Sequence, residues 1–330
     1  MSDIQASTLF SAKGLVAVVT GGGTGIGLMI ATALEHNGAT KVYIVGRRKE
    51  VLENAARVHS KHGNIIPIVG EVTSKESLEA IVKTVESEVG YVNLLVNNAG
   101  MCGRRHNVLP APPGLVSRPG AAEQYKNIED VQKFLWEDSM EEWEGTFRGM
   151  SACDSPWGRG SFVWLLTQRS KTTVNVTGAW FASVAFLRLL DQGNKRGVVE
   201  QSSQQIITIT SIASFLRNLG TCFSYNASKA AITQVAKMLA THFPQYGIRC
   251  NMIAPGLFPS ELTAGSGKMD SGNKNQLDAF PAERIPLKRP GSDEDMAGAI
   301  LYLAGRAGAY VNGNVMVVDG GRMSVLPATY

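Results

Sequence analysis

Seven short apolar runs recur along the 330-residue chain, and each has the length of a β-strand. Between most of them lie segments whose apolar residues are spaced three and four apart, as in amphipathic helices. Near-continuous apolar strands are typical of a parallel sheet that helices cover on both faces. The runs cover residues 15–19, 42–45, 65–69, 94–96, 206–209, 248–253 and 315–318.

The alternation of strands and helices predicts the fold class. Strand, helix and strand repeated in this way indicate an α/β protein with a single Rossmann-like, doubly wound, seven-stranded parallel sheet flanked by helices. Because the strands are spread along the whole chain, we expect a single domain over residues 1–330. The helical segments cover residues 26–36, 49–62, 75–89, 225–243 and 293–306.

Two segments interrupt this alternation. Residues 101–127 are rich in proline, glycine and arginine and have no periodicity, so we expect a variable loop there. Residues 149–173 also lack a sustained pattern, and so long an irregular segment is uncommon inside a compact domain. We expect 149–173 to be an insertion.

Composition and charge narrow the class of protein. The chain is 44% hydrophobic and 18% charged, which is typical of a globular protein with a filled core. Its formal net charge is +4, and the basic residues are scattered, whereas a nucleic-acid binder concentrates them in a patch. The N-terminus lacks a signal peptide pattern, and the longest apolar stretch, 174–190, is interrupted by Asn175 and Arg188. We therefore expect a cytoplasmic protein that contacts neither nucleic acid nor membrane.

Cysteine and histidine spacing gives no metal or disulfide signal. The cysteines form no CxxC pair and have no regular spacing, so we expect free thiols in a reducing compartment. His59 and His62 share a helix face, but no further ligand is near in sequence, so we expect solvated side chains and no metal site. The four cysteines are Cys102, Cys153, Cys222 and Cys250.

A glycine-rich stretch, TGGGTGIG at residues 20–27, follows the first strand directly and opens a helix. Glycines in this place let the backbone approach a pyrophosphate, and the helix N-terminus offers free N–H groups to the anion. We therefore predict a dinucleotide site. Its candidate residues here are Thr20, Gly21, Gly25, Ile26 and Gly27.

The end of the second strand indicates which dinucleotide binds. An NAD site places an acidic residue there to bind the ribose 2′-hydroxyl. This chain has Arg47, Arg48 and Lys49 instead, with no acid before Glu50. An arginine pairs with a 2′-phosphate in a fork geometry, so Arg47 predicts NADP(H). A solvated start to the next helix is the alternative, and it suits Lys49 and Arg48.

Tyr225 and Lys229 are four residues apart and therefore share a helix face. A free tyrosine titrates near pH 10, and a neighbouring ammonium lowers that pKa toward a range useful for acid/base catalysis. Alone, such a pair is common and usually structural. Here it stands in order with the glycine-rich stretch, with 97–100 (NNAG) after the fourth strand, with Ser211 after the fifth, and with Pro255 and Gly256 after the sixth.

That ordered set resembles the short-chain dehydrogenase/reductase superfamily, over nearly the whole chain apart from 101–127 and 149–173. The segments 254–260 and 310–321 are similar to those of fungal members that resemble 3-oxoacyl-acyl-carrier-protein reductases and the rhamnolipid-pathway type of ketoreductase. The resemblance implies an NADP(H)-dependent enzyme that interconverts a ketone or 3-oxoacyl group and a secondary alcohol by hydride transfer. It also implies a small-molecule substrate and a homodimer or homotetramer.

The resemblance carries over catalytic roles to particular residues. Tyr225 would be the general acid/base, and Lys229 would hold the nicotinamide ribose and depress the pKa of the tyrosine. Ser211 would hydrogen-bond the reacting oxygen, with Ser214 as the second candidate. Asn175 would anchor a water that relays protons to Lys229.

The resemblance also extends the cofactor site. Asn98 would brace the sheet beside the cofactor, and Ser260 would touch the nicotinamide amide. Glu71 departs from the family, which usually has aspartate before the hydrophobic residue at the adenine. The further residues implied to line the cofactor site are Val72, Ala99, Gly100, Pro255 and Gly256, with Tyr225 and Lys229 also in contact.

The spacing before Asn175 departs from the family. A tryptophan usually precedes this asparagine by seven residues, whereas Trp143 and Asn175 are 32 apart. Removing the 25 residues 149–173 restores the usual spacing. We therefore hypothesise that this segment is foreign to the fold: a translated intron, a gene-model error or a lineage insertion. A catalytically silent NADP-binding scaffold or sensor stays open as the second functional class.

Overall fold

The computed structural model describes residues 4–102, 174–197, 204–217, 222–261 and 280–329, together with positions 130, 132 and 263. The insertion 149–173, Trp143 and nearly all of the loop 101–127 lie outside the described residues. The hypothesis about 149–173 therefore stays a prediction.

The seven expected strands form one parallel sheet in the order β3-β2-β1-β4-β5-β6-β7, which confirms the predicted fold class. Strand order reverses between β1 and β4, and ligands of such sheets bind in the crevice beyond the carboxyl ends of the strands at this point. The strands are β1 (Val16–Thr20), β2 (Lys41–Gly46), β3 (Ile65–Val69), β4 (Leu94–Asn97), β5 (Gln204–Ile209), β6 (Ile248–Pro255) and β7 (Val315–Val318).

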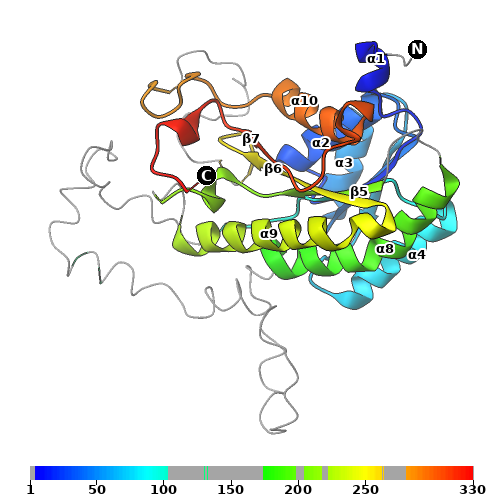
Figure 1. The fold of residues 1–330 in the computed structure, drawn as a ribbon. Helices are drawn as coiled ribbons and strands as arrows, with labels where there is room; N and C mark the ends of the chain where they lie inside the picture. The colour runs from blue at the N-terminus through cyan, green and yellow to red at the C-terminus, as the bar shows by residue number, and fades with distance from the viewer. Residues whose placement is uncertain are drawn as a thin grey trace, which may run out of the picture.

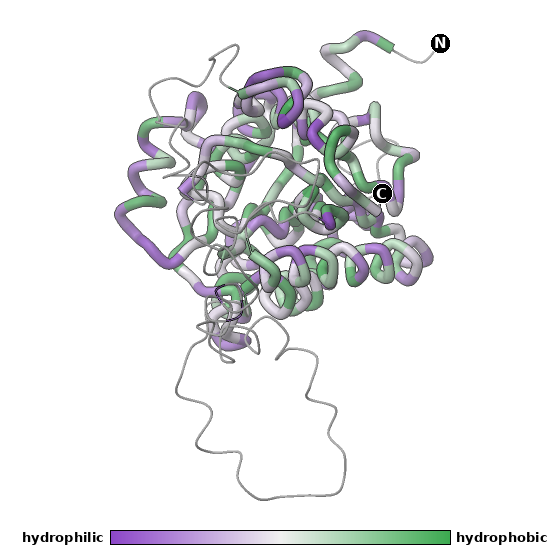
Figure 2. The backbone as a smooth tube through the Cα atoms, turned by 90° about the vertical axis from the view of Figure 1, so that its left-hand side faces the viewer, coloured by the Kyte–Doolittle hydropathy of each residue, from purple (hydrophilic) through white to green (hydrophobic). Residues whose placement is uncertain are grey.

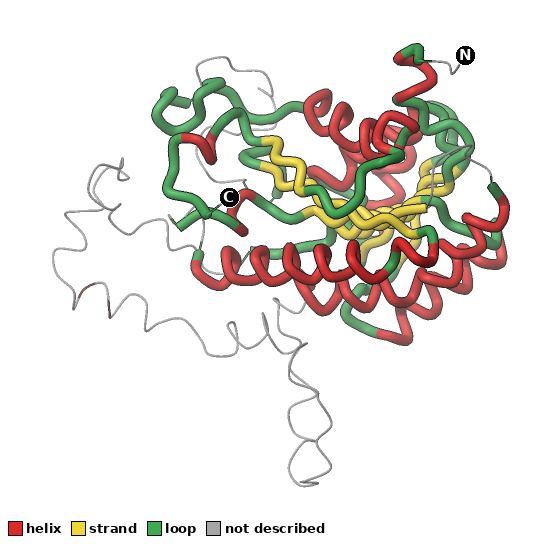
Figure 3. Tube along the Cα trace, viewed as in Figure 1, coloured by secondary structure: helices red, strands yellow, loops and turns green. Residues whose placement is uncertain are grey.

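Helices cover both faces of the sheet (Figures 1 and 3). On one face lie α2 (Gly25–His36), α3 (Lys49–His59) and α10 (Asp293–Ala304). On the other lie α4 (Lys75–Glu88), α8 (Ala179–Arg196) and α9 (Phe223–His242). Short helical turns complete the described part: α1 (Ala6–Leu9), η3 (Val174–Gly178), η4 (Ile212–Ser214), η5 (Pro244–Tyr246), η6 (Arg306–Gly308) and η7 (Arg322–Ser324).

Each face of the sheet has its own apolar core. Leu34 of α2 and Ile300 of α10 pack with Ile44 of β2 on one side. Phe186 and Leu189 of α8 pack with the strands on the other. Hydrophobic residues follow the strands through the interior in Figure 2. Within the described part of the chain, no helix is long and apolar enough to cross a membrane.

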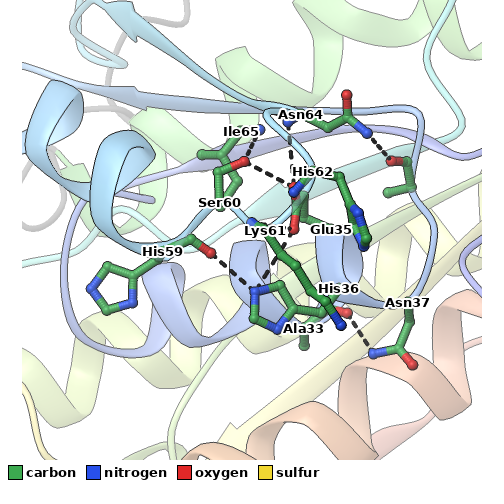
Figure 4. A network of polar contacts seen from close by, with 11 residues as sticks. Ala33, Glu35, His36, Asn37, His59, Ser60, Lys61, His62, Asn64 and Ile65 are labelled. Carbon is green, nitrogen blue, oxygen red and sulfur yellow. Dashed lines mark hydrogen bonds and ion pairs between the residues drawn. The ribbon is translucent and has the colours of Figure 1, made fainter.

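Helix α3 ends at His59, so the predicted extension to residue 62 is wrong. The cause is Glu35, a fully buried carboxylate near the end of α2. Figure 4 shows that residues of the turn between α3 and β3 surround this carboxylate and bind it. It accepts the backbone N–H groups of Lys61 (3.1 Å), His62 (2.6 Å) and Asn64 (3.3 Å) and the Ser60 hydroxyl (2.8 Å). A fourth helical turn would remove these donors from the carboxylate.

Glu35→Gln is expected to destabilise the fold by about 2–3 kcal/mol, because a buried carboxylate is bound by several donors and an amide would place its own N–H group among them. Burial raises the pKa of Glu35, but the hydrogen bonds from His62, Ser60, Lys61 and Asn64 together lower it below 4.5. The carboxylate therefore stabilises the fold fully above pH 4.5, and this contribution is lost as the pH falls toward the lowered pKa of the folded state.

Urea unfolding of Glu35→Gln at neutral and acid pH checks this. The exposed Glu53, which pairs with Lys49, provides the matched control Glu53→Gln, expected to change stability by less than about 0.5 kcal/mol. Equal stability of the two variants, or an unchanged acid slope in Glu35→Gln, would contradict the role given to Glu35.

Candidate active site

The glycine-rich stretch turns from β1 into α2 with backbone angles that favour glycine. Gly21 has φ +66° and Gly25 has φ +53°. A Cβ on Gly21 would lie 2.9 Å from the Cα of Ala99, and one on Gly25 would lie 2.9 Å from the Cβ of Ser260. The loop is therefore held between the segment after β4 and the segment after β6, and larger residues would push both away.

Thr20 and Asn98 fasten the ends of β1 and β4 to each other. The Thr20 hydroxyl accepts the N–H groups of Asn98 (3.0 Å) and Ala99 (3.1 Å) and donates to the carbonyl of Val96 (3.2 Å). The Asn98 amide donates to the carbonyls of Thr20 (3.0 Å) and Gly21 (3.1 Å). These hydrogen bonds are the contacts that the predicted bracing role of Asn98 requires.

The N-terminus of α2 opens toward the crevice without a side chain to cap it. Thr24 is the N-cap residue and makes no side-chain cap hydrogen bond, and the first turn holds no acidic residue. Exposed helix N–H groups and the positive end of the helix dipole attract anions. The loop therefore presents a place for a phosphate group.

A cavity of about 530 Å³ runs along the carboxyl ends of the strands, a size typical of small-molecule sites. It brings together all predicted cofactor and catalytic residues except three: Thr20 and Gly27, which pack behind the glycine-rich loop, and Asn175, which lies behind the wall. The predicted residues that line it are Gly21, Gly25, Ile26, Arg47, Val72, Asn98, Ala99, Gly100, Ser211, Tyr225, Lys229, Pro255, Gly256 and Ser260.

The two arginines after β2, Arg47 and Arg48, both line this cavity, and Arg48 forms an ion pair across it. Its Nη2 lies 2.9 and 3.0 Å from the carboxylate oxygens of Glu261, in the segment after β6. Arg48 is thus part of the cavity wall, but it is also the N-cap residue of α3 and its side chain is more than half exposed, so the interpretation as a solvated helix start still applies to it. Lys49 fits that interpretation, because it is exposed and pairs with Glu53 of its own helix.

The adenine end of the predicted site has an ordered acidic residue. The N–H of Glu71 donates to the Ser77 hydroxyl (2.8 Å), and its carboxylate accepts the Thr73 hydroxyl (2.5 Å). Glu71, Val72 and Thr73 all line the cavity. Glutamate therefore lies where the resemblance expects aspartate.

Lys229 and Tyr225 lie on one face of α9, at the opposite end of the cavity. Lys229 is buried, donates to the carbonyl of Ile209 (2.9 Å), and its Nζ lies 5.8 Å from the centre of the Tyr225 ring. Burial lowers the pKa of Lys229 to about 8. The Lys229 ammonium and the Tyr225 phenol therefore lie near each other at one wall of the cavity.

The pKa of Tyr225 is shifted in the direction opposite to the one expected from a neighbouring Lys229. Burial raises the pKa of Tyr225 to about 12, although a hydrogen bond with Ser211 lowers it in part and the nearby Cys102 and Cys222 raise it further. The ammonium of Lys229 is directed to the Ile209 carbonyl and is itself weakened by burial. The phenol is therefore protonated over the neutral range.

Ser211 rather than Ser214 faces the cavity. Ser211 is the N-cap residue of η4, where its hydroxyl accepts the N–H of Ala213 (3.1 Å), and it lines the cavity beside Tyr225. The Ser214 hydroxyl accepts that of Thr233 (3.0 Å) and does not line the cavity. The first of the two candidate serines is therefore the one in reach of a bound reactant.

Asn175 lies in a π-helical turn, η3, directly before α8, and turns of this kind occur frequently at functional sites. Its amide oxygen accepts the N–H of Met101 (2.7 Å), and its amide nitrogen donates to the carbonyl of Met101 (2.8 Å) and to the hydroxyl of Ser228 (3.0 Å). Both amide hydrogens are used by protein partners. The side chain thus holds the cavity wall at Met101 against α9.

Sequence reasoning missed Met101, Cys102 and Glu261 as residues of the cavity wall. No local sequence pattern identifies these residues, because their contacts join distant parts of the chain. Cys102 contacts Cys222 across 120 residues, and Arg48 contacts Glu261 across 213. Among the described residues, no three His, Cys, Asp or Glu side chains gather as a metal site requires.

A doubly wound parallel sheet with a glycine-rich turn at its switch point defines a dinucleotide-binding class of α/β protein. Two family models match the chain: short chain dehydrogenase over residues 15–114, and Enoyl-(Acyl carrier protein) reductase over residues 168–323. The Short-chain dehydrogenase/reductase PhomF of Diaporthe leptostromiformis is 46% identical over 329 residues, 98% of this chain and 97% of that protein. The chain belongs to the short-chain dehydrogenase/reductase family, and it is an oxidoreductase of that family.

Two matches from Pseudomonas aeruginosa, one in sequence and one in structure, extend the comparison. The Rhamnolipids biosynthesis 3-oxoacyl-[acyl-carrier-protein] reductase of Pseudomonas aeruginosa is 30% identical over 312 residues, 94% of this chain and 97% of that protein. The solved structure of the Pseudomonas aeruginosa RhlG/NADP active-site complex has a TM-score of 0.68 and 28% identity, and the match covers 95% of this chain and 98% of that one.

Proposed function

We propose that the protein is an NADP(H)-dependent ketoreductase that reduces a ketone or 3-oxoacyl group to a secondary alcohol, with Tyr225 as the proton donor. The observation that carries the proposal is the meeting of Ser211, Tyr225 and Lys229 at one end of a cavity whose other end holds two arginines. The NADP complex among the structural neighbours and the 3-oxoacyl reductase among the relatives support it.

The residues present fit a phosphorylated dinucleotide. A Cβ on Gly21 would fill the cradle at the turn, and the uncapped start of α2 offers its N–H groups to a pyrophosphate. Arg47 and Arg48 stand at the adenosine end, where a 2′-phosphate would need positive charge. When bound, the reduced cofactor supplies the hydride.

The chain's own residues then handle the substrate oxygen and its proton. The Ser211 hydroxyl orients the reacting carbonyl oxygen beside the Tyr225 phenol. Because the pKa of Tyr225 is raised to about 12, the phenol carries its proton at neutral pH and donates it as negative charge develops on that oxygen. Lys229, with a pKa near 8, is the adjacent group that can return a proton to the phenol. At neutral pH the phenol is therefore in the protonated form that reduction of a carbonyl requires.

Mixing full-length protein and NADPH with a panel of ketones and 3-oxoacyl thioesters, and following the loss of NADPH absorbance, tests the proposal. Turnover of any member supports a reductase. The alternative of a silent NADP-binding scaffold or sensor predicts binding, measured as NADPH fluorescence, without turnover. A variant that lacks 149–173 then tests whether that segment causes the silence.

Arg47→Ala is expected to weaken NADPH binding by about 10- to 100-fold and to leave NADH binding unchanged, because only NADPH loses a charge-assisted contact to its 2′-phosphate. Fluorescence titration with both nucleotides measures the ratio. Lys49→Ala is the matched control. It removes an equal charge two residues along the chain from Arg47, and the Lys49 side chain pairs with Glu53. Equal weakening of both nucleotides in Arg47→Ala would contradict a 2′-phosphate contact.

The proposal includes a homodimer or homotetramer in the cytoplasm. Exposed apolar side chains on α8 and α9, among them Trp180, Val184 and Met238, are consistent with helices that pair between subunits.

A further inference from the structure

Two cysteines that are far apart in the sequence meet at the catalytic end of the cavity. The sulfur atoms of Cys102 and Cys222 lie 3.9 Å apart. Cys102 is partly exposed and lines the cavity, whereas Cys222 is fully buried. Neither is in a disulfide. A small solute in the cavity can therefore reach the Cys102 sulfur, and the Cys222 sulfur lies buried behind it.

The position of Cys222 suits a thiol that takes part in exchange. It is the N-cap residue of the 20-residue helix α9, three positions before Tyr225. The positive end of a helix favours a thiolate, the form that attacks a neighbouring sulfur. Its sulfur also lies 3.4 Å from the Ser224 hydroxyl, a second polar group that stabilises negative charge there.

We propose that Cys102 and Cys222 form a peroxide-sensitive thiol pair, which closes to a disulfide and switches the active site off. Cys102 releases its proton and the thiolate attacks hydrogen peroxide, so an S–O bond forms, the O–O bond breaks, and the departing hydroxide takes up that proton and leaves as water. Cys222 releases its proton and the thiolate attacks the Cys102 sulfur, so the S–S bond forms, the S–O bond breaks, and the second hydroxide takes up that proton and leaves as water. Two thiols lose two electrons in all, and one peroxide gains them.

Closure moves the cavity wall. A disulfide requires the two sulfurs to be about 2.05 Å apart, so they must approach each other from 3.9 Å. Cys222 is fixed at the start of α9, and the shift therefore falls on Cys102 and its neighbour Met101. The backbone of Met101 is bound on both sides by the Asn175 amide, which also binds Ser228 of α9. Oxidation thus displaces the wall that Asn175 holds beside Tyr225.

The loss of activity rests on the proposed function, whereas the disulfide does not. A displacement of about 1 Å near reacting groups costs about 10²-fold in rate, so peroxide is expected to lower turnover of the screened ketone by that factor. NADPH binding is measured alongside by fluorescence. A dithiol reductant should restore the rate.

The experiment uses the reduced full-length protein, treated with hydrogen peroxide and then alkylated. Mapping of non-reduced peptides should find residue 102 joined to residue 222, and the intact mass measured before alkylation should fall by two hydrogen atoms. The double variant C153S/C250S leaves only the pair and should still close. In the wild-type protein Cys250 is the internal control, because burial raises its pKa to about 12 and it lies neither in the cavity wall nor beside Cys102, as Cys222 does.

Two single variants complete the test. C102S and C222S should each lack the cross-link and should each keep their own untreated rate when peroxide is added. The idea is overturned if no 102–222 disulfide forms, or if it forms and turnover is unchanged. If the reduced protein turns over no carbonyl, the proposed function fails, while peptide mapping still decides whether the pair closes.

Discussion

Tyr225→Phe is expected to lower kcat for carbonyl reduction by about 10²- to 10⁴-fold, the usual contribution of a general acid. The change removes a single oxygen from a ring that is held in place by α9, so NADPH affinity should change by less than about threefold. Stopped-flow absorbance gives the rate of the chemical step, and fluorescence titration gives the affinity. Tyr246→Phe, which removes the same atom from an exposed ring after α9, is the control.

The pH profile of the wild-type protein reports on Lys229, whereas the rate of Tyr225→Phe reports on the phenol. With the pKa of Tyr225 raised to about 12, the phenol does not ionise between pH 6 and 9. Lys229 does titrate there, because burial lowers its pKa to about 8. In the wild-type protein kcat/KM should therefore fall as the pH rises through about 8. A Tyr225→Phe variant that kept both the rate and this profile would refute the assignment of the proton donor.

The strands were predictable because the inner strands lie buried between two layers of helices and are mainly apolar, and the partly buried edge strands β3 and β7 are short apolar runs as well. Observed β3 and β7 have the predicted bounds, and β6 runs on to Pro255, past the apolar run, because the following turn still pairs with β7. The glycine-rich loop was predictable for a different reason. Its chemistry is local, since a turn from a strand into a helix that must pass close to Ala99 tolerates no side chain at Gly21.

Contacts that join distant segments were not predictable. Glu35 reads as one more polar residue of a helix, yet its carboxylate organises residues 60–64 because α2 and the α3–β3 turn are neighbours in space. The contact between Arg48 and Glu261 and the contact between Cys102 and Cys222 likewise join segments that are neighbours only in the folded protein. The pKa of Tyr225 was predicted in the wrong direction because four-residue spacing places an ammonium nearby but cannot report burial.

Gly27→Ala is expected to destabilise the protein by about 3 kcal/mol and to abolish measurable NADPH binding. Gly27 is in α2, where alanine is intrinsically the better helix former by about 1 kcal/mol. However, a Cβ at this position would lie well under 3.0 Å from the carbonyl oxygen of Gly21 and the amide nitrogen of Asn98. The Asn98 amide donates to that carbonyl, so it cannot retreat without releasing the end of β1.

Gly298→Ala supplies the opposite case within the same fold. Gly298 lies in α10, and a Cβ there would meet nothing within 4 Å. The same substitution should stabilise the protein by about 0.5–1 kcal/mol, since only the helix preference acts. Thermal and urea unfolding of both variants, with NADPH titration, measures the difference. If Gly27→Ala were as stable as Gly298→Ala and still bound NADPH, the close contact between α2 and the end of β4 would not be what requires glycine in this loop.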